Sequence, residues 1–373
     1  GVPNYLEAPG YKSGAVNAKL GGGSFGSPPA IADLDGDGKN EIVVTSWNGA
    51  IYIIEHDGTR RKGWPKRLPA VPSCPRDGSK PTGPCSSESA IIDAGAFAAP
   101  VLVDMDKDGD LDIVQAAFDG KVYAFDIDGN DIPGWPVTIH YDGKLVEEPS
   151  QGRVFTTPAV GDFNGDGIPE VLVGSNERLG EGEQSGAIYL IDGRGTTLGP
   201  KPWLTNWPVT MTSFYLFPLV SEGVTNSGVI SSYDGKPAAV MHGNASLPLI
   251  LPADPGEQSI INETPANVLP EYTDPDTGET RRGVAPSSQF GELSPAFRPN
   301  TMFPLFGQPA LGDIDQDGVT DVIASGSSLN LAINLQKGAG KLPGEHLISV
   351  WSGKTGKMLP GAPFVIEDYS FFN

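Results

Sequence analysis

The chain has 373 residues, including 49 glycines and 35 prolines, and its formal net charge is −21. A charge of that sign argues against a nucleic-acid ligand, because phosphate contacts need clustered lysine and arginine. Apolar residues make up 38% and can still form a core, so the many turn formers predict short strands joined by turns.

The N-terminal stretch GVPNYLEAPG has neither the charged region nor the apolar region of a signal peptide. No run of 18 apolar residues occurs in the sequence, and a membrane-spanning helix needs about that many. We therefore expect no membrane span, and we expect any signal peptide to have been removed.

Four acidic stretches give the chain an internal repeat. They are DLDGDGKNE at 33–41, DMDKDGDLD at 104–112, DFNGDGIPE at 162–170 and DIDQDGVTD at 313–321. Each follows an aromatic residue, a proline and a short apolar run, and each precedes two further apolar runs, a turn and a Trp-Pro element or a looser version of it. Short runs rich in Val, Ile, Tyr and Ala predict strands. Four short antiparallel strands per repeat predict one blade of a β-propeller.

In chain order, the repeats divide a single propeller region, residues 1–373, into five blades and two large insertions. The blades are expected at about 25–70, 96–140, 154–211, 214–256 and 303–368, and the insertions at 71–94 and 254–302. The fourth blade is degenerate, because Ser221, Gly223 and Thr225 stand where acidic residues would fall. The predicted fold class is all-β, a propeller of four-stranded antiparallel blades.

The first insertion holds both cysteines, Cys74 and Cys85, in a segment rich in Pro, Gly and Ser. No CxxC or haem motif flanks them. We expect a disulfide that closes a surface loop, and hence an oxidising compartment, with a pair of free thiols as the alternative.

The last residues, APFVIEDYSFFN at 362–373, resemble NWPVTMTSFYLFP at 206–218, which leads from one blade into the next. We therefore expect a ring of six to eight blades that further blades or a partner chain complete. An open blade face would leave a large apolar surface in water. A closed ring of five blades is the alternative.

The acidic stretches have the composition of a calcium loop. Counted from the first aspartate, side-chain oxygens fall at positions 1, 3, 5 and 9, and position 7 offers a backbone carbonyl. Five or more hard oxygen donors suit calcium better than magnesium. The predicted ligands of the four Ca²⁺ sites are Asp33, Asp35, Asp37, Lys39 and Glu41; Asp104, Asp106, Asp108, Asp110 and Asp112; Asp162, Asn164, Asp166, Ile168 and Glu170; and Asp313, Asp315, Asp317, Val319 and Asp321.

An EF-hand does not fit these loops, because it needs a bidentate glutamate at position 12. This chain has Val44, Gln115, Val173 and Ala324 there. Each short loop supplies its whole ligand set, and no obvious general base stands nearby. We therefore expect the ions to be structural, not catalytic, and their binding to be coupled to the folding of each blade.

The aromatic-Gly start, the proline and the DxDxDGxxD/E loop together resemble the FG-GAP, or VCBS, repeat of integrin α-subunit propellers and of many bacterial secreted and surface proteins. The resemblance covers most of residues 25–368. It implies a β-propeller with calcium in the loop between the first two strands of a blade, at the positions given above. The Gly-Trp-Pro element is common in the bacterial branch. The resemblance therefore implies an exported bacterial protein, extracellular or at the cell surface, more than an integrin.

Antiparallel blades place the acidic loops and the turns after the third strands on one face, and the insertions on the opposite face. We expect that opposite face to bind a protein or a glycan, because long loops on a rigid scaffold often carry recognition. Tolerated decoration is the alternative. Trp64, Trp135 and Trp207 belong to the repeated Trp-Pro element, so we expect them to pack within the blades and not to stack on sugars.

The function expected from these features is that of a calcium-stabilised binding or adhesion module, not an enzyme. A polysaccharide lyase is the main alternative, since some of these enzymes are calcium-rich propellers with similar loops. Against it, the histidines stand singly and form no HExxH motif: His56, His140, His242 and His346. A structural subunit of an extracellular assembly is the third interpretation.

Overall fold

The computed structural model describes residues 26–47, 49–69, 95–140, 153–176, 178–179, 184–212, 223–233, 236–243, 249–253, 271–273, 280–282, 302–303, 308–328, 346–355, 359–362 and 364–366. The chain divides into two compact units. The first comprises Gly1–Thr138, Arg153–Pro158 and Arg194–Pro200; the second comprises Ile139–Gly152, Ala159–Gly193 and Lys201–Asn373.

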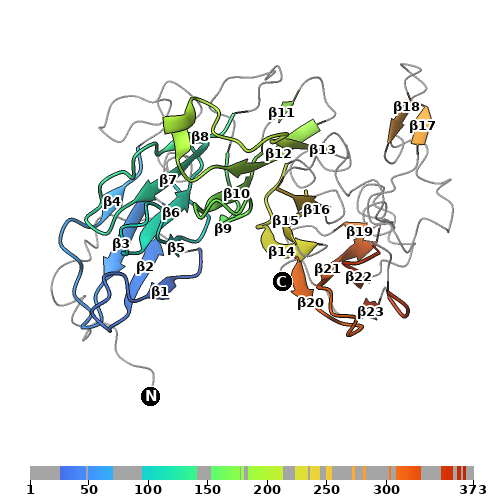
Figure 1. Ribbon diagram of the computed structural model, residues 1–373, viewed down its shortest axis with the longest axis horizontal. Coiled ribbons are helices and arrows are strands. Elements are labelled where there is room, and N and C mark those ends of the chain that lie inside the picture. The colour runs from blue at the N-terminus through green and yellow to red at the C-terminus, as the bar shows by residue number, and fades with distance from the viewer. Residues whose placement is uncertain are drawn as a thin grey trace, which may run out of the picture. The chain divides into compact units, whose positions relative to one another are not determined.

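The first unit contains two four-stranded sheets (Figure 1). Their strand orders are β1-β2-β3-β4 and β5-β6-β7-β8, and all neighbouring strands are antiparallel. The bounds are β1 Ala30–Ala32, β2 Glu41–Thr45, β3 Ala50–Ile54, β4 Lys66–Arg67, β5 Val101–Val103, β6 Asp112–Ala116, β7 Lys121–Phe125 and β8 Val137–Thr138. In both sheets the spatial order equals the chain order, as in a propeller blade. The 3₁₀ helix η3, Gly195–Leu198, also belongs to this unit.

The core of the first unit lies between these two sheets. Val43 in β2 pairs with Ala30 and Ile53, so it has a strand on each side. Val43, Ile51 and Ile53 are fully buried in one cluster that also contains Ile113 and Phe125 of the second sheet. β-Branched side chains favour a pleated strand with one buried face, as in β2, where buried and partly exposed residues alternate.

The second unit contains three further main sheets. The third sheet has β9 Ala159–Gly161, β10 Glu170–Gly174, β12 Gln184–Ile191 and β13 Val209–Thr212 in this order, with β11 Arg178–Leu179 added on β12. The fourth has β14 Val229–Tyr233, β15 Lys236–Met241 and β16 Leu249–Pro252. The fifth has β20 Ala310–Gly312, β21 Asp321–Ser328, β22 His346–Trp351 and β23 Phe364–Ile366, with β19 Met302–Phe303 pairing the end of β21. A separate hairpin pairs β17 Glu271–Thr273 with β18 Thr280–Arg282.

These sheets confirm the predicted all-β class and its four-stranded antiparallel unit. The first, second, third and fifth sheets each contain four sequential antiparallel strands, and three strands of the fourth lie within the described residues. The number of blades in a complete ring stays a prediction.

The sequence alignment of the fourth blade was wrong in its first half. The N–H of Val224 donates to the carbonyl of Ser175, as the N–H of Val154 donates to Ala117, so residues 224–228 lead into the first strand, β14. Tyr233 pairs with Lys236, so the first two strands of this sheet are only two residues apart in the sequence. Gly223 and Thr225 therefore precede the first strand, and Ser221 lies outside the described residues. Without acidic residues to fix the phase, a run of small residues can be aligned several residues away.

Candidate metal centres in the acidic loops

Each acidic stretch connects the first two strands of a sheet. We name the stretches loop A (33–41), loop B (104–112), loop C (162–170) and loop D (313–321). They join β1 to β2, β5 to β6, β9 to β10 and β20 to β21. The prediction that strands and not helices flank the loops is therefore confirmed.

The acid at the ninth position anchors each loop to its own second strand. This residue is at most 1% exposed in all four loops. One of its carboxylate oxygens accepts the backbone N–H of the second loop residue. The bonds are Leu34 to Glu41 at 3.0 Å, Met105 to Asp112 at 2.8 Å, Phe163 to Glu170 at 2.7 Å and Ile314 to Asp321 at 2.8 Å. The ninth position therefore shapes the loop, in addition to its predicted role as a ligand.

The exposed carboxylates fold each loop back on itself. The first aspartate accepts the N–H of the glycine at position 6 in loops A, C and D, at 2.9 to 3.0 Å. The residue at position 5 accepts the N–H of position 7 in all four loops, at 2.8 to 2.9 Å. In loop A the sixth residue is Gly38, whose φ of 85° lies in the left-handed region that glycine adopts without strain.

Three of the loops bring predicted ligands together. One oxygen each from Asp33, Asp35 and Asp37 lie within 4.8 Å of one another in loop A. The corresponding groups are Asp104, Asp106 and Asp108 in loop B, and Asp313, Asp315 and Asp321 in loop D. Glu41, Asp112 and Asp317 do not belong to these groups. The carbonyl donors predicted at Lys39, Asp110, Ile168 and Val319 stay predictions.

Loop C gathers a different set, which includes a residue that the sequence analysis missed. Its group is Asp166, Glu170 and Asp192, without Asp162. Asp192 follows the third strand, β12, and is 3% exposed. Antiparallel strand order places the turn after the third strand at the same end of the sheet as the loop after the first. That topology, together with the neutral Asn164 at position 3, was the sequence signal that could have pointed to Asp192.

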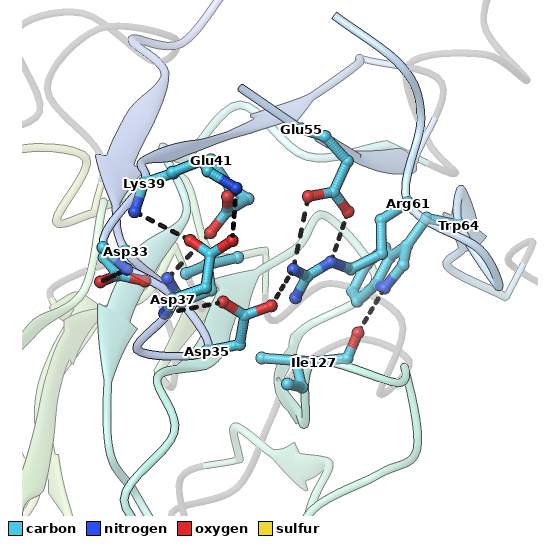
Figure 2. Close-up of polar contacts among 11 residues, drawn as sticks. Asp33, Asp35, Asp37, Lys39, Glu41, Glu55, Arg61, Trp64 and Ile127 are labelled. Atoms are coloured by element: carbon cyan, nitrogen blue, oxygen red, sulfur yellow. Dashed lines mark hydrogen bonds and ion pairs between the residues drawn. The ribbon is translucent and has the colours of Figure 1, made fainter. Parts of the chain in front are cut away.

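Loop A has a cationic neighbour that the sequence analysis also missed (Figure 2). Nη2 of Arg61 is 2.6 Å from Oδ2 of Asp35, and Nε of Arg61 is 2.6 Å from Oε1 of Glu55. Both Glu55 and Arg61 belong to the segment that follows the third strand, β3. The turn after the third strand therefore contributes charge to loops A and C alike.

Burial and mutual repulsion perturb two of the ninth-position acids. Burial raises the pKa of Asp112 to about 7; a hydrogen bond from Met105 lowers it, and the charges of Asp106, Asp108 and Asp104 raise it. Burial likewise raises the pKa of Glu170 to about 7, against a hydrogen bond from Phe163, and the charge of Asp166 adds to the rise. A cation bound at the loop would favour the charged forms and lower both pKa values.

The donor chemistry of the loops fits calcium. All the gathered side-chain donors are carboxylate oxygens, which a hard cation prefers. Oδ1 of Asp33 and Oδ1 of Asp104 are buried atoms that accept no hydrogen bond. A buried charged oxygen without a donor is costly, and a cation at the centre of the carboxylate group would satisfy it.

The tryptophans of the Trp-Pro element are packed, as the sequence predicted. Trp64, Trp135 and Trp207 are 3%, 5% and 6% exposed. Nε1 of Trp64 donates to the carbonyl of Ile127, in the turn after β7, at 2.8 Å, and Nε1 of Trp207 donates to the carbonyl of Ala253, just after β16, at 2.8 Å. These bonds join neighbouring sheets.

The predicted disulfide between Cys74 and Cys85 lies outside the described residues.

Comparison with known proteins identifies a repeat family over part of the chain. Residues 104–173 match the family described as FG-GAP-like repeat, which confirms the sequence resemblance over loops B and C. The sequence matches no curated protein. Within the described residues, no helix is long and apolar enough to cross a membrane.

Several solved structures are similar to the chain at low identity. BamB from Moraxella catarrhalis is 11% identical with a TM-score of 0.43, over 93% of this chain and 66% of that one. The C-terminal domain of PilY1 from Pseudomonas aeruginosa is 13% identical with a TM-score of 0.44, over 87% and 61%. The quinohemoprotein alcohol dehydrogenase ADHIIG from Pseudomonas putida HK5 is 13% identical with a TM-score of 0.44, over 90% and 52%. The chain thus spans about half to two thirds of each of these proteins, and likeness at this level assigns no function.

Proposed function

The chain carries the FG-GAP-like repeat at residues 104–173, and from this premise we propose that it is an extracellular, calcium-stabilised propeller module that binds a protein or a glycan. One observation carries the calcium part of the proposal. Four loops at equivalent places in four sheets each gather three carboxylate oxygens within 4.8 Å.

Calcium would act as a structural ion in this proposal. Three carboxylates this close repel one another, and a divalent cation between them turns that repulsion into attraction. Bound calcium supplies positive charge and no redox or acid-base chemistry. Asp33, Asp35 and Asp37 would hold it in loop A, Asp104, Asp106 and Asp108 in loop B, and Asp313, Asp315 and Asp321 in loop D. In loop C, Asp166 and Glu170 would act together with Asp192.

We propose that the partner binds at the ends of the sheets opposite the acidic loops. In the first unit, a row of aromatic rings supports this choice: Trp47 lies 5.3 Å from Phe97, and Phe97 lies 6.5 Å from Phe118, between ring centroids. Trp47 and Phe118 follow second strands, and Phe97 precedes a first strand, so all three lie at the ends away from loops A and B. Phe97 is 44% exposed, and an exposed ring beside other rings suits apolar side chains or sugar faces.

An extracellular location, in a bacterium, agrees with the proposed chemistry. Calcium sites of extracellular modules have dissociation constants of about 0.1 to 1 mM, and exposed loops of this kind fit that range. The cell surface or the external medium supplies calcium at such concentrations. An adhesion role and an export route follow from the sequence resemblance and belong to the same proposal.

The calcium part is tested by thermal unfolding of the full chain. Calcium-depleted protein is compared with the same protein in about 1 mM calcium, and with the same concentration of magnesium as the control. We expect calcium to raise Tm by several degrees and magnesium to raise it less. Equal Tm values in all three samples would contradict the proposal.

The binding part is tested with labelled full chain on glycan arrays and on extracted surface proteins. Phe97→Ala should weaken capture, whereas Ile314→Ala should not. Ile314 is the matched control, because it is 53% exposed and lies in loop D at the other end of its sheet. Loss of capture only in Ile314→Ala would contradict the proposal, because it would place the partner at the ends of the sheets that carry the acidic loops. Unsaturated products from acidic polysaccharides, read by absorbance, would instead identify a lyase.

A further inference from the structure

Arg61 is a largely buried cation at the edge of loop A (Figure 2). Its side chain is 13% exposed, and it donates hydrogen bonds to both Asp35 and Glu55. Burial lowers the pKa of the guanidinium, but the hydrogen bonds to Glu55 and Asp35 outweigh burial and raise it. Arg61 is therefore charged at neutral pH.

The backbone position of Arg61 recurs in other sheets with apolar residues. The N–H of Arg61 donates to the carbonyl of Ile53 in the third strand, and the carbonyl of Arg61 accepts the N–H of Trp64. The same pair of backbone bonds is made by Ile132, Leu204 and Leu359. The side chain at this position is aliphatic in three sheets, and among the four sheets in which the structure describes the position, only the first has a charged residue there.

Arg61 occupies an oxygen of a residue that loop A would use to bind calcium. Oδ1 of Asp35 accepts the N–H of Asp37 at 3.3 Å, and Oδ2 accepts from Arg61. Asp106 in loop B accepts the equivalent N–H at 3.2 Å. Within the part of the chain that the structure describes, no cation pairs with Asp106.

Loops A and B share their gathered aspartates but differ at position 7, where Lys39 pairs with Asp37 at 3.1 Å in loop A and loop B has Asp110. Both have aspartates at positions 1, 3 and 5, and both gather these three residues. Both are in the same compact unit. They also touch, since the N–H of Leu111 donates to the carbonyl of Leu34 at 3.0 Å. Loop B is therefore the reference site in the same unit, and variants of Arg61 itself separate its effect from that of Lys39.

We propose that Arg61 is a built-in competitor of calcium, a positioning residue that holds Asp35 and makes loop A a weaker calcium site than loop B. This inference rests on the proposed function, because it concerns the affinity of the proposed calcium sites. The guanidinium repels a cation bound beside it and shares Asp35 with it. Loop A therefore fills only at calcium concentrations at which loop B is already occupied.

The test is a calorimetric calcium titration of the full, calcium-depleted chain. Asp33→Asn and Asp104→Asn identify the binding steps of loops A and B by removing each in turn. Arg61→Ile introduces the residue that Ile132 provides in the second sheet, and Arg61→Gln removes the charge while keeping a polar side chain. Arg60→Gln is the matched control, since Arg60 is the exposed neighbour with the same charge.

We expect Arg61→Ile and Arg61→Gln each to lower the dissociation constant of loop A by about tenfold. Arg60→Gln and Arg61→Lys should leave it near the wild-type value. An unchanged or higher dissociation constant for loop A in both neutral variants would overturn the inference while loop B still binds calcium. Absence of binding at loop B as well would instead show that the proposed function fails. Circular dichroism confirms that each variant is folded.

Discussion

At the scale of single residues, the acidic loops are a problem of charge balance. Asp112 and Glu170 are buried at the ends of loops that contain several other carboxylates. Because a nearby cation favours the charged form of an acid, pKa values near 7 mean that proton binding to these two acids opposes calcium binding at loops B and C. Calcium binding and proton binding are therefore linked at these residues.

We expect the stability of calcium-depleted protein to fall as pH rises between about pH 5 and pH 8. The pKa of Asp112 rises from 3.8 to about 7 on folding, and that of Glu170 from 4.5 to about 7. In this window the folded state holds more protons than the unfolded state, so deprotonation destabilises the fold. The stabilisation is fully present only below the unfolded pKa values and is lost as pH passes the folded ones.

Calcium should oppose this loss of stability at higher pH, because a bound cation stabilises the deprotonated carboxylates. The measurement is Tm against pH, with and without about 1 mM calcium. The difference between the two curves should widen as pH rises, because protons no longer compete for the carboxylates. A difference that is constant or narrows toward high pH would show that these two acids do not control calcium binding.

Asp192 should be a calcium ligand of loop C even though it lies outside the repeat motif. Asp192→Asn should weaken the loop C site by about tenfold, because the neutral Asn164 leaves this loop short of charge. Asp126→Asn is the control, since Asp126 follows the third strand of the second sheet and is not part of the loop B group. Calorimetry on both variants should show a change only for Asp192. Equal effects of the two substitutions would contradict the prediction, because they would show a long-range charge effect on calcium binding and not a ligand role of Asp192.

At the scale of structural elements, the acidic loop and the turn after the third strand pack closely against each other. A Cβ on Gly193 would meet the carbonyl oxygen of Pro169, and a Cβ on Gly353 would meet that of Thr320. Pro169 and Thr320 are the eighth residues of loops C and D. The N–H of Gly353 also donates to Asp321 at 3.1 Å. Glycine permits this close approach of two backbones.

Gly353→Ala should therefore push the turn away from loop D. We expect a loss of about 1–3 kcal/mol in the free energy of unfolding, as for other overpacked sites, and weaker calcium binding at loop D. Gly312→Ala in β20 is the control, because its added Cβ would make ordinary contacts at 3.7 and 3.9 Å. Denaturant unfolding of both variants measures the difference. Equal stability of the two variants would show that the turn can move freely away from the loop.

The contact between each acidic loop and the turn after the third strand separates what the sequence could predict from what it could not. Short apolar runs such as AIYII and the fixed phase of the DxDxDG stretches were enough to predict the strands and loops A to D. Asp192 reaches Glu170 only because β12 pairs with β10 in a particular register, with Ile191 opposite Val171. No local spacing encodes that register. Arg61 was missed for the same reason, since its partner Asp35 is 26 residues away.

At the scale of the whole chain, cations bound in the four acidic loops would reduce the large negative net charge. Four divalent cations would change the formal charge from −21 to −13. Self-repulsion of a highly charged chain opposes the compact state. The calcium-depleted protein should therefore depend on salt more strongly than the calcium-loaded protein.

We expect Tm of the calcium-depleted protein to rise by several degrees between about 20 mM and 500 mM NaCl, because salt shortens the screening length from about 20 Å to less than 5 Å. The calcium-loaded protein should gain less, since its largest clusters of charge are already neutralised. Choline chloride separates screening from binding, because the choline ion is too large to enter a loop whose oxygens lie within 4.8 Å of one another. Equal effects of the two salts would identify general repulsion as the cause. A rise with NaCl alone would mean that sodium binds the loops, and the stabilisation would then come from specific coordination and not from the total charge.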